Sequence, residues 1–380
     1  MTPGARIAAA IELLDQVATG APVEQALTRW ARAHRFAGSK DRAAIRDHVF
    51  DALRNWRSDA VRGGAETGRG RMIGRLRAEG IDPDTLFTGE GYAPAPLSDV
   101  ERQELGAPQS EGAAWNMPDW LVPLWRDSLG ADAEETARHN MARAPITLRA
   151  RADPHQVAKA LSLEGIETRA NPRAPKALTV VSGMSRLRGS KALANGQIEL
   201  QDASSQAVVS AVSGQGTALD YCAGGGGKAL ALADQGWTVT AYDKDPARMT
   251  DIPRRAARAR VTIELANNRA PKGVFDLVFC DAPCSGSGAW RRTPQAKWML
   301  TPDKLKELQQ AQDAVLEAAK DHVAVGGQLV YVTCSVIKAE NSERCAAFLG
   351  RNPGWQCAQE ERWPLDSLGD GFYFARFLRL

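Results

Sequence analysis

The sequence predicts an α/β protein in which a doubly wound, mostly parallel sheet follows an all-helical N-terminal module and a small α+β unit. Through the first sixty residues, apolar side chains recur at helical spacing. The segment from Thr217 to Asp243 reads as strand, glycine loop, helix and strand, the unit from which doubly wound sheets are built. Short apolar runs that suit buried strands follow it. We therefore expect three domains, at 1–115, 116–200 and 201–380.

The N-terminal module is predicted to contain three helices. Amphipathic patterns cover residues 5–18 and 22–35, and a third helix begins at Ser39, which can cap its first turn. One apolar stripe runs along this third helix, made of Ile45, Val49, Leu53 and Trp56. A helical bundle is therefore expected for this part of the chain.

Charge is distributed unevenly along the chain. Residues 1–77 carry 14 Lys and Arg against 8 Asp and Glu, and residues 137–191 carry 11 against 3. Between these basic blocks, residues 78–115 carry 1 against 8. Because residues 63–115 are also rich in Gly and Pro, we expect a linker there. The basic blocks indicate either a surface that binds a phosphate backbone or simply a solvated surface.

Regular structure resumes at Pro118. Two helices are expected near residues 119–125 and 133–141, followed by a strand at 145–151, a helix at 155–164 and a strand at 178–181. This order predicts a small α+β unit ahead of the large sheet.

The glycine loop of the core runs from Ala223 to Lys228, between strands at 217–222 and 238–243. Glycines are needed where the bare N–H groups of a helix start must approach a cofactor closely. Asp243, at the end of the second strand, is placed to accept hydrogen bonds from ribose hydroxyls. This unit alone fits either S-adenosylmethionine or a nicotinamide dinucleotide.

The stretch from Phe275 to Trp298 carries the most distinctive chemistry. Its strand, Leu277 to Cys280, ends at Asp281 and is followed by Cys284 and small residues. The next strand, 328–333, is followed directly by Cys334. Since ligands bind beyond the carboxyl ends of parallel strands, neighbouring positions for these two strands would put both thiols in one cleft.

Composition narrows the class of protein. With 380 residues, 44% hydrophobic and 24% charged, the chain resembles an ordinary globular protein, and it has no apolar run long enough to cross a membrane. We expect a cytoplasmic protein without a membrane partner. The six cysteines include no C-x-x-C pair, so neither a disulfide framework nor a metal site is predicted.

The cysteine motifs resemble a known family. Asp281-Ala-Pro-Cys-Ser-Gly-Ser-Gly, then Arg291-Arg292, Lys297-Trp298, Thr333-Cys334-Ser335 and Glu340-Asn341, are similar to the RsmB-type RNA 5-methylcytosine methyltransferases. The resemblance implies a Rossmann-like methyltransferase core that uses S-adenosylmethionine, an RRM-like subdomain and a NusB-like helical RNA-binding domain. It also implies a monomeric protein that acts on RNA of the small ribosomal subunit or on an assembling particle.

The resemblance assigns roles residue by residue. Cys334 is the implied nucleophile, Asp281 the acid that binds the base, and Cys284 the residue needed for product release. The implied RNA-binding residues are Arg291, Arg292 and Lys297. The implied cofactor-binding residues are Cys222, Ala223, Gly224, Gly225, Gly226, Gly227, Lys228, Asp243, Asn267 and Asp281. The chemistry is consistent, because a thiolate that adds to carbon 6 of cytosine makes carbon 5 nucleophilic.

Two departures from the family pattern bear on the cofactor. The loop has Gly224 and Gly225 where the family usually has Ala-Pro, so a stiff turn is replaced by a flexible one. Asn267 stands where the family places an acid. Three other functions remain open from the residues: methylation of transfer RNA, RNA binding or ribosome assembly without catalysis, and nicotinamide-dependent oxidoreduction.

Overall fold

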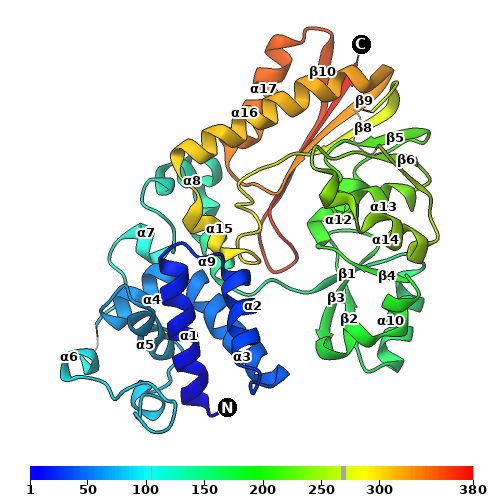
Figure 1. Ribbon diagram of the computed structural model, residues 1–380. Coiled ribbons are helices and arrows are strands. Elements are labelled where there is room, and N and C mark those ends of the chain that lie inside the picture. The colour runs from blue at the N-terminus through cyan, green and yellow to red at the C-terminus, as the bar shows by residue number, and fades with distance from the viewer. Residues whose placement is uncertain (104, 267–270, 380) are drawn as a thin grey trace. The chain divides into compact units, whose positions relative to one another are not determined.

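The computed structural model describes residues 1–103, 105–266 and 271–379 (Figure 1). The chain forms two compact units. The first comprises Met1–Arg143 together with Trp290–Met299, and the second comprises Ala144–Ala289 together with Leu300–Leu380. In the described part of the chain, no helix is both long and apolar enough to span a bilayer.

The first unit is helical, as the sequence predicts. Ile7, Leu14, Ile45 and Val49 are fully buried in its core, which explains the apolar spacing of the first and third helices. Its helices are α1 (Pro3–Ala18), α2 (Val23–Ala33), α3 (Ser39–Arg54), α4 (Trp56–Gly63), α5 (Gly68–Ala78), α6 (Asp99–Arg102), α7 (Glu111–Ala114), α8 (Leu121–Leu129), α9 (Ala133–Met141) and α15 (Pro294–Met299).

Part of the expected linker is a core helix. α5 buries Met72, Ile73 and Leu76, although its sequence is rich in Gly and Arg. Its glycines serve close packing, because a Cβ on Gly74 would lie 1.9 Å from the backbone oxygen of Asp59 on α4. The glycines that suggested a loop are therefore the contact between two helices.

A short segment distant in sequence also belongs to this helical unit. The Trp290 ring stacks on Trp125 of α8, with centroids 5.9 Å apart. Gln295 on α15 donates to the carbonyl of Ala21, and Trp298 Nε1 donates to the carbonyl of Leu53 at 2.8 Å. The chain thus leaves the second unit after Ala289 and returns to it at Leu300.

The second unit begins with a four-stranded antiparallel sheet in the order β2-β3-β1-β4. The predicted strands near 145–151 and 178–181 and the helix near 155–164 are confirmed. The polar, mostly exposed β2 and the three-residue β4 give little periodic signal, so they escaped prediction. The elements are β1 (Thr147–Ala150), α10 (Pro154–Leu163), β2 (Glu167–Ala170), β3 (Ala177–Ser182), α11 (Lys191–Ala194) and β4 (Ile198–Leu200).

The large sheet has seven strands in the order β10-β11-β9-β8-β5-β6-β7. Strands β5 to β9 are parallel to one another, and β11 pairs antiparallel with both β9 and β10, so that β10 and β11 form the expected antiparallel pair at one edge. The strands are β5 (Thr217–Asp220), β6 (Thr238–Ala241), β7 (Ile263–Leu265), β8 (Phe275–Asp281), β9 (Val323–Thr333), β10 (Trp355–Trp363) and β11 (Phe372–Arg379).

Helices cover both faces of this sheet (Figure 1). Leu277 and Phe279 of β8 pack with helices α12 and α14 on one face, while Val278 and Cys280 pack with α16 and α17 on the other. Because successive side chains of β8 point to opposite faces and both faces are covered by helices, the strand is apolar at nearly every position. These helices are α12 (Ala203–Ser210), α13 (Gly227–Ala233), α14 (Ile252–Ala259), α16 (Pro302–Ala319) and α17 (Ser342–Arg351).

Candidate active site

The two predicted thiols meet at the carboxyl edge of the large sheet. β8 and β9 are parallel neighbours, and Asp281 at the end of β8 pairs in register with Val332 of β9. The residues that follow each strand therefore leave the sheet side by side. Cys284 Sγ lies 3.5 Å from Cys334 Sγ. This confirms the expectation that both thiols line one cleft.

A buried lysine connects the glycine loop to the cysteines. Lys228 Nζ lies 2.5 Å from Asp281 Oδ2. Burial disfavours the ammonium form, but the charge and hydrogen bond of Asp281 outweigh it and raise the pKa of Lys228. The ammonium group also interacts electrostatically with Cys334. Lys228 is therefore placed to interact with negative charge that forms on the Cys334 sulfur during a reaction.

The second thiol lies in a different environment. The hydrogen bond with Cys334 and burial raise the pKa of Cys284 well above its ordinary value. Cys284 therefore holds its proton. Burial also raises the pKa of Cys222, Cys280 and Cys345, as expected for thiols that serve as small apolar side chains.

A cavity of about 900 Å³ opens beside the two thiols. The ends of β5, β6 and β8 and one side of α16 form its walls. Its lining residues are Tyr221, Cys222, Tyr242, Asp243, Lys244, Asp245, Arg248, Asp281, Ala282, Pro283, Cys284, Ala311, Ala314, Val315 and Cys334. It contains the predicted nucleophile, the predicted base-binding acid and the predicted ribose acceptor in one space.

The glycine loop forms a tight turn next to this cavity. Gly224 has a φ of +48° and Gly226 a φ of +78°, a left-handed conformation that favours glycine. The backbone N–H of Gly224 donates to Asp243 Oδ2 at 2.9 Å, and Arg248 pairs with the same oxygen. The unusual glycines at this loop thus hold Asp243, which is itself buried.

Sequence reasoning missed an acid at the end of β5. Asp220 is fully buried, and neither carboxylate oxygen forms a regular hydrogen bond with a described residue, although the Ala229 N–H is near enough to favour its ionised form. Burial, followed by the charge of Asp281, raises the pKa of Asp220 to about 7. Its position directly before the glycine loop was the available signal.

Glu340, which the sequence motif includes without a role, lies beside the two cysteine loops. The carboxylate of Glu340 is fully buried and accepts from Ser285 N at 2.8 Å, Ser285 Oγ at 2.5 Å, Ser335 Oγ at 2.5 Å and Gln312 Nε2 at 3.0 Å. We call these four residues the Glu340 network. Ser285 follows Cys284 and Ser335 follows Cys334, so one carboxylate holds both cysteine loops together.

The remaining predicted residues lie as follows. The predicted RNA-binding residues Arg291 and Lys297 are buried, and Arg292 is half-buried. Burial and the charge of Arg54 lower the pKa of Lys297 to about 7. Their pairing with RNA phosphates stays a prediction. Asn267 lies outside the described residues. The described residues contain no cluster of three or more His, Cys, Asp or Glu suited to a metal ion.

The fold and site together define the class of protein. A doubly wound sheet, with a glycine turn after one central strand, an acid after the next and a ligand-sized cavity beyond both, is the architecture of a cofactor-binding α/β protein of the Rossmann-like class. The crystal structure of PH0851 superposes with a TM-score of 0.78 over 100% of this chain and 99% of that chain, at 22% identity. A methyltransferase homolog protein from Pyrococcus horikoshii has a TM-score of 0.62 over 71% of this chain and 97% of that chain, at 21% identity.

Sequence comparisons identify the family. The family described as 16S rRNA methyltransferase RsmB/F matches residues 207–378, and the RsmF/B-like ferredoxin-like domain matches residues 117–185. Ribosomal RNA small subunit methyltransferase B from Xylella fastidiosa is 33% identical over 76% of this chain and 74% of its own length. The protein of that name from Cronobacter sakazakii is 31% identical over 74% and 72%. The chain therefore belongs to the RsmB/F family and is an S-adenosylmethionine-dependent RNA methyltransferase.

Proposed function

We propose that this enzyme methylates carbon 5 of a cytosine in small-subunit ribosomal RNA through a covalent cysteine adduct. The observation that carries this proposal is the pair of thiols from adjacent strand ends, 3.5 Å apart in one cavity with Asp281 and Lys228. The names of the relatives support the choice of small-subunit RNA. The helical unit and the small sheet are proposed to hold the RNA.

The reaction begins at Cys334. Its thiolate adds to carbon 6 of the cytosine and forms an S–C6 bond, which moves electron density to carbon 5. The Lys228 ammonium lies next to the negative charge of the attacking sulfur, and Asp281 accepts hydrogen bonds from the amine of the base and from its ring nitrogen once that nitrogen carries a proton. S-Adenosylmethionine, when bound, supplies an electrophilic methyl group. Once carbon 5 carries the methyl group, its proton must leave before the S–C6 bond can break.

Cys284 is assigned to the second part of the reaction, the removal of the carbon 5 proton and the release of the product. It lies against Cys334 and holds its proton in the free enzyme, so it must first give that proton to solvent. Its thiolate can then accept the proton that carbon 5 loses next to the adduct. Loss of the carbon 5 proton and of the Cys334 thiolate restores the aromatic ring. The products are 5-methylcytosine, the demethylated cofactor and one proton, so the atoms balance.

The cofactor site is assigned to residues around the glycine loop. Asp220, buried directly before the glycine loop, is the acid proposed to attract the ammonium group of the cofactor, and Asp243 lines the cavity just beyond β6, where ribose hydroxyls are bound in such folds. Lys228 is already paired with Asp281, so its first role is in the catalytic pair rather than in holding a cofactor carboxylate.

The test distinguishes the roles of the two thiols. Cys334→Ala should abolish both methylation and covalent protein–RNA species. Cys284→Ala should keep the attack but slow release, so that incubation with small-subunit RNA and S-adenosylmethionine accumulates a denaturation-resistant, RNase-sensitive band. Cys357→Ala, which changes an exposed cysteine on β10, is the matched control and should behave as the wild type.

Two results would contradict the proposal. If Cys334→Ala traps RNA and Cys284→Ala does not, the roles of the thiols are reversed. If both variants keep methylation activity, the two-thiol mechanism is wrong for this enzyme. Bisulfite sequencing of the ribosomal RNA from a deletion strain would then identify the modified cytosine or show that none is lost.

A further inference from the structure

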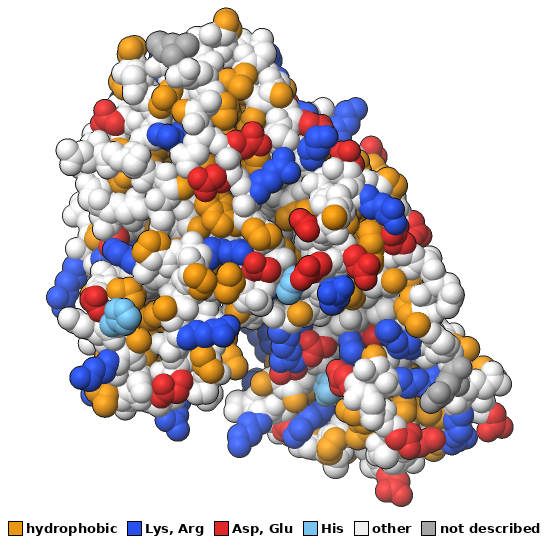
Figure 2. All heavy atoms as spheres, turned by 180° about the vertical axis from the view of Figure 1, so that it is seen from behind, with side chains coloured by type: hydrophobic (Ala, Val, Ile, Leu, Met, Phe, Trp, Pro, Cys, Tyr) orange, Lys and Arg blue, Asp and Glu red, His pale blue; other side chains and the backbone are white. Residues whose placement is uncertain are grey.

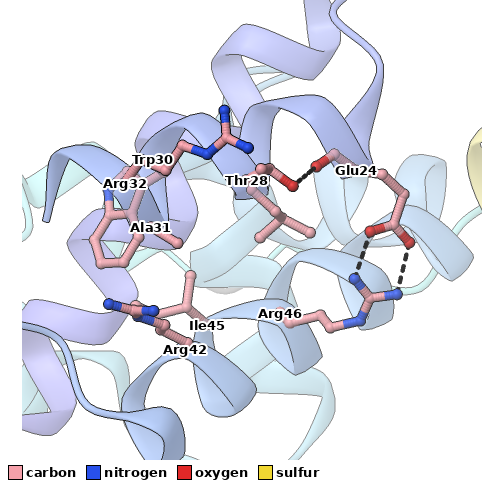
Figure 3. Close-up of a pocket in the computed structure, with 9 residues that line it drawn as sticks. Glu24, Thr28, Trp30, Ala31, Arg32, Arg42, Ile45 and Arg46 are labelled. Carbon is pink, nitrogen blue, oxygen red and sulfur yellow. Dashed lines mark hydrogen bonds and ion pairs between the residues drawn. The ribbon is translucent and has the colours of Figure 1, made fainter. Parts of the chain in front are cut away.

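A pocket between α2 and α3 of the helical unit has no role in the chemistry described above. Its volume is about 360 Å³. Trp30 and Arg32 from α2 and Arg42, Ile45 and Arg46 from α3 line it, and in Figure 3 the side chain of Arg32 points away from α3 while Arg42 lies on the α3 side. All of these residues belong to one compact unit, so the pocket is a property of the helical unit by itself.

The positive charge in this pocket is not neutralised. Glu24, the acid that lines it, is occupied by Arg46 through two hydrogen bonds of 2.6 Å, shown as dashed lines in Figure 3. Arg32 and Arg42 are exposed, and neither forms an ion pair with any carboxylate among the described residues. Two guanidinium groups therefore remain available to an anion.

A buried donor in the same pocket also lacks an acceptor. Trp30 is only 6% exposed, and its Nε1 has no hydrogen-bond partner among the residues that the structure describes. A buried N–H without an acceptor is costly, and native proteins usually supply one. A ligand oxygen that comes within hydrogen-bond distance of Trp30 Nε1 would satisfy this donor.

Aromatic rings extend from the pocket to the surface. Trp30 stacks on His34, with centroids 4.3 Å apart, and Phe36 lies edge-on to His34. The Phe36 side chain is 71% exposed, which is unusual for so large an apolar group. Exposed rings beside arginines are the combination that binds unpaired bases and their phosphates.

We infer that this pocket binds a phosphate of single-stranded RNA while an adjacent base stacks on Phe36. Arg42 would bind the oxygens of this phosphate and Arg32 those of the next phosphate along the strand, and Arg29 and Arg35, also exposed, continue the basic surface along the chain. On the face shown in Figure 2, Lys and Arg side chains lie among acidic ones rather than in one continuous patch. The unpaired arginines and the unfilled Trp30 donor therefore indicate an RNA-binding site more specifically than the overall charge of the surface does. The inference rests on the proposed RNA substrate.

The test measures RNA binding by the full-length enzyme. Fluorescence anisotropy with a labelled single-stranded RNA of twelve nucleotides would be recorded from 50 to 300 mM KCl. Arg32→Gln/Arg42→Gln should weaken binding about tenfold, and the slope of log affinity against log salt should fall by about 1.4, since each phosphate contact contributes about 0.7 for a single strand. Trp30→Phe, which removes only the donor, and Phe36→Ala should each weaken binding about threefold.

The matched control is Arg126→Gln/Arg138→Gln. It removes the same two charges from exposed side chains of the same unit, on α8 and α9. We expect less than a twofold change. Arg32→Lys/Arg42→Lys should recover most of the salt slope. In methylation assays the pocket variant should raise KM for RNA and leave kcat unchanged, because the lost contacts are made equally in the ground and transition states.

The outcomes separate this inference from the proposed function. If the pocket variant and the control lose affinity equally, or if an acidic peptide competes for the pocket and RNA does not, the inference is overturned. Methylation of ribosomal RNA by the wild type would still support the proposed function. If the wild type binds RNA through the pocket but modifies no cytosine, the proposed function fails and the pocket assignment stands.

Discussion

Two buried carboxylates of the methyltransferase unit, Glu340 and Asp220, contrast in how they are satisfied. Glu340 accepts four hydrogen bonds from Ser285, Gln312 and Ser335. Asp220 is equally buried, yet both its oxygens lack a regular partner among the described residues. A satisfied buried acid fixes the protein around it, whereas an unsatisfied one stores an unfavourable interaction that a cationic ligand can relieve. The difference separates a structural support from a binding residue.

The largest effect is expected at the satisfied carboxylate. Glu340→Ala leaves buried donors on both cysteine loops without an acceptor, which should cost roughly 3–5 kcal/mol of stability. Thermal unfolding should shift down by roughly 10 °C for a unit of this size. Formation of the covalent adduct should also decrease, because the two loops that carry the cysteines lose the carboxylate that holds both of them.

Two variants sharpen this prediction. Glu340→Gln keeps the shape and one acceptor, so it should lose only about 1–2 kcal/mol. Glu343→Ala removes an exposed acid from the neighbouring α17 and should leave both melting and adduct formation unchanged. If Glu340→Ala and Glu343→Ala have the same midpoint of thermal unfolding, the Glu340 network does not hold the cysteine loops.

An effect of comparable size, but opposite in sign, is expected at the unsatisfied carboxylate. The folded-state pKa of Asp220 is about 7, above the ordinary value of 3.8, so the folded state holds this proton more tightly than the unfolded state. Stability is therefore lost as the pH rises from about 4 to about 7, by an amount on the order of 4 kcal/mol, and is constant above that range. Asp220→Asn removes this dependence.

The measurement is urea unfolding of the cofactor-free protein between pH 5 and pH 8. Asp220→Asn should become more stable relative to the wild type as the pH rises, and its affinity for S-adenosylmethionine should fall at least tenfold by calorimetry. Asp251→Asn, a change at an exposed carboxylate, should alter neither quantity. Equal pH profiles for the wild type and Asp220→Asn would show that Asp220 carries no unrelieved charge.

The smallest expected change tests a charge that the sequence lacks. Asn267→Asp restores the acid that the family pattern places there, so the affinity for S-adenosylmethionine should tighten by about 1 kcal/mol, the difference between a neutral and a charge-assisted hydrogen bond. Calorimetry measures it directly. An unchanged dissociation constant would place residue 267 outside the cofactor site and leave Asp220 and Asp243 as the acids that face the ligand.

Local patterns in the sequence determined the core of this protein. The strand, glycine loop and strand from Thr217 to Asp243, the strands that end at Asp281 and before Cys334, and the antiparallel edge pair all follow from apolar runs and turn residues. The rule that parallel strands present their carboxyl ends at one edge then brings the two thiols together. Such signals are readable because each depends on neighbours in the chain.

Only the tertiary structure decided the rest. The acceptor role of Glu340 depends on Ser285, 55 residues away in sequence, and the placement of Trp298 depends on Leu53, 245 residues away. The glycines of α5 mark a helix contact rather than a linker because α4 packs against them. The unpartnered states of Asp220 and of the Trp30 donor are likewise invisible in sequence. Burial and hydrogen bonding between distant residues are properties of the packed chain, so periodicity and turn chemistry carry no record of them.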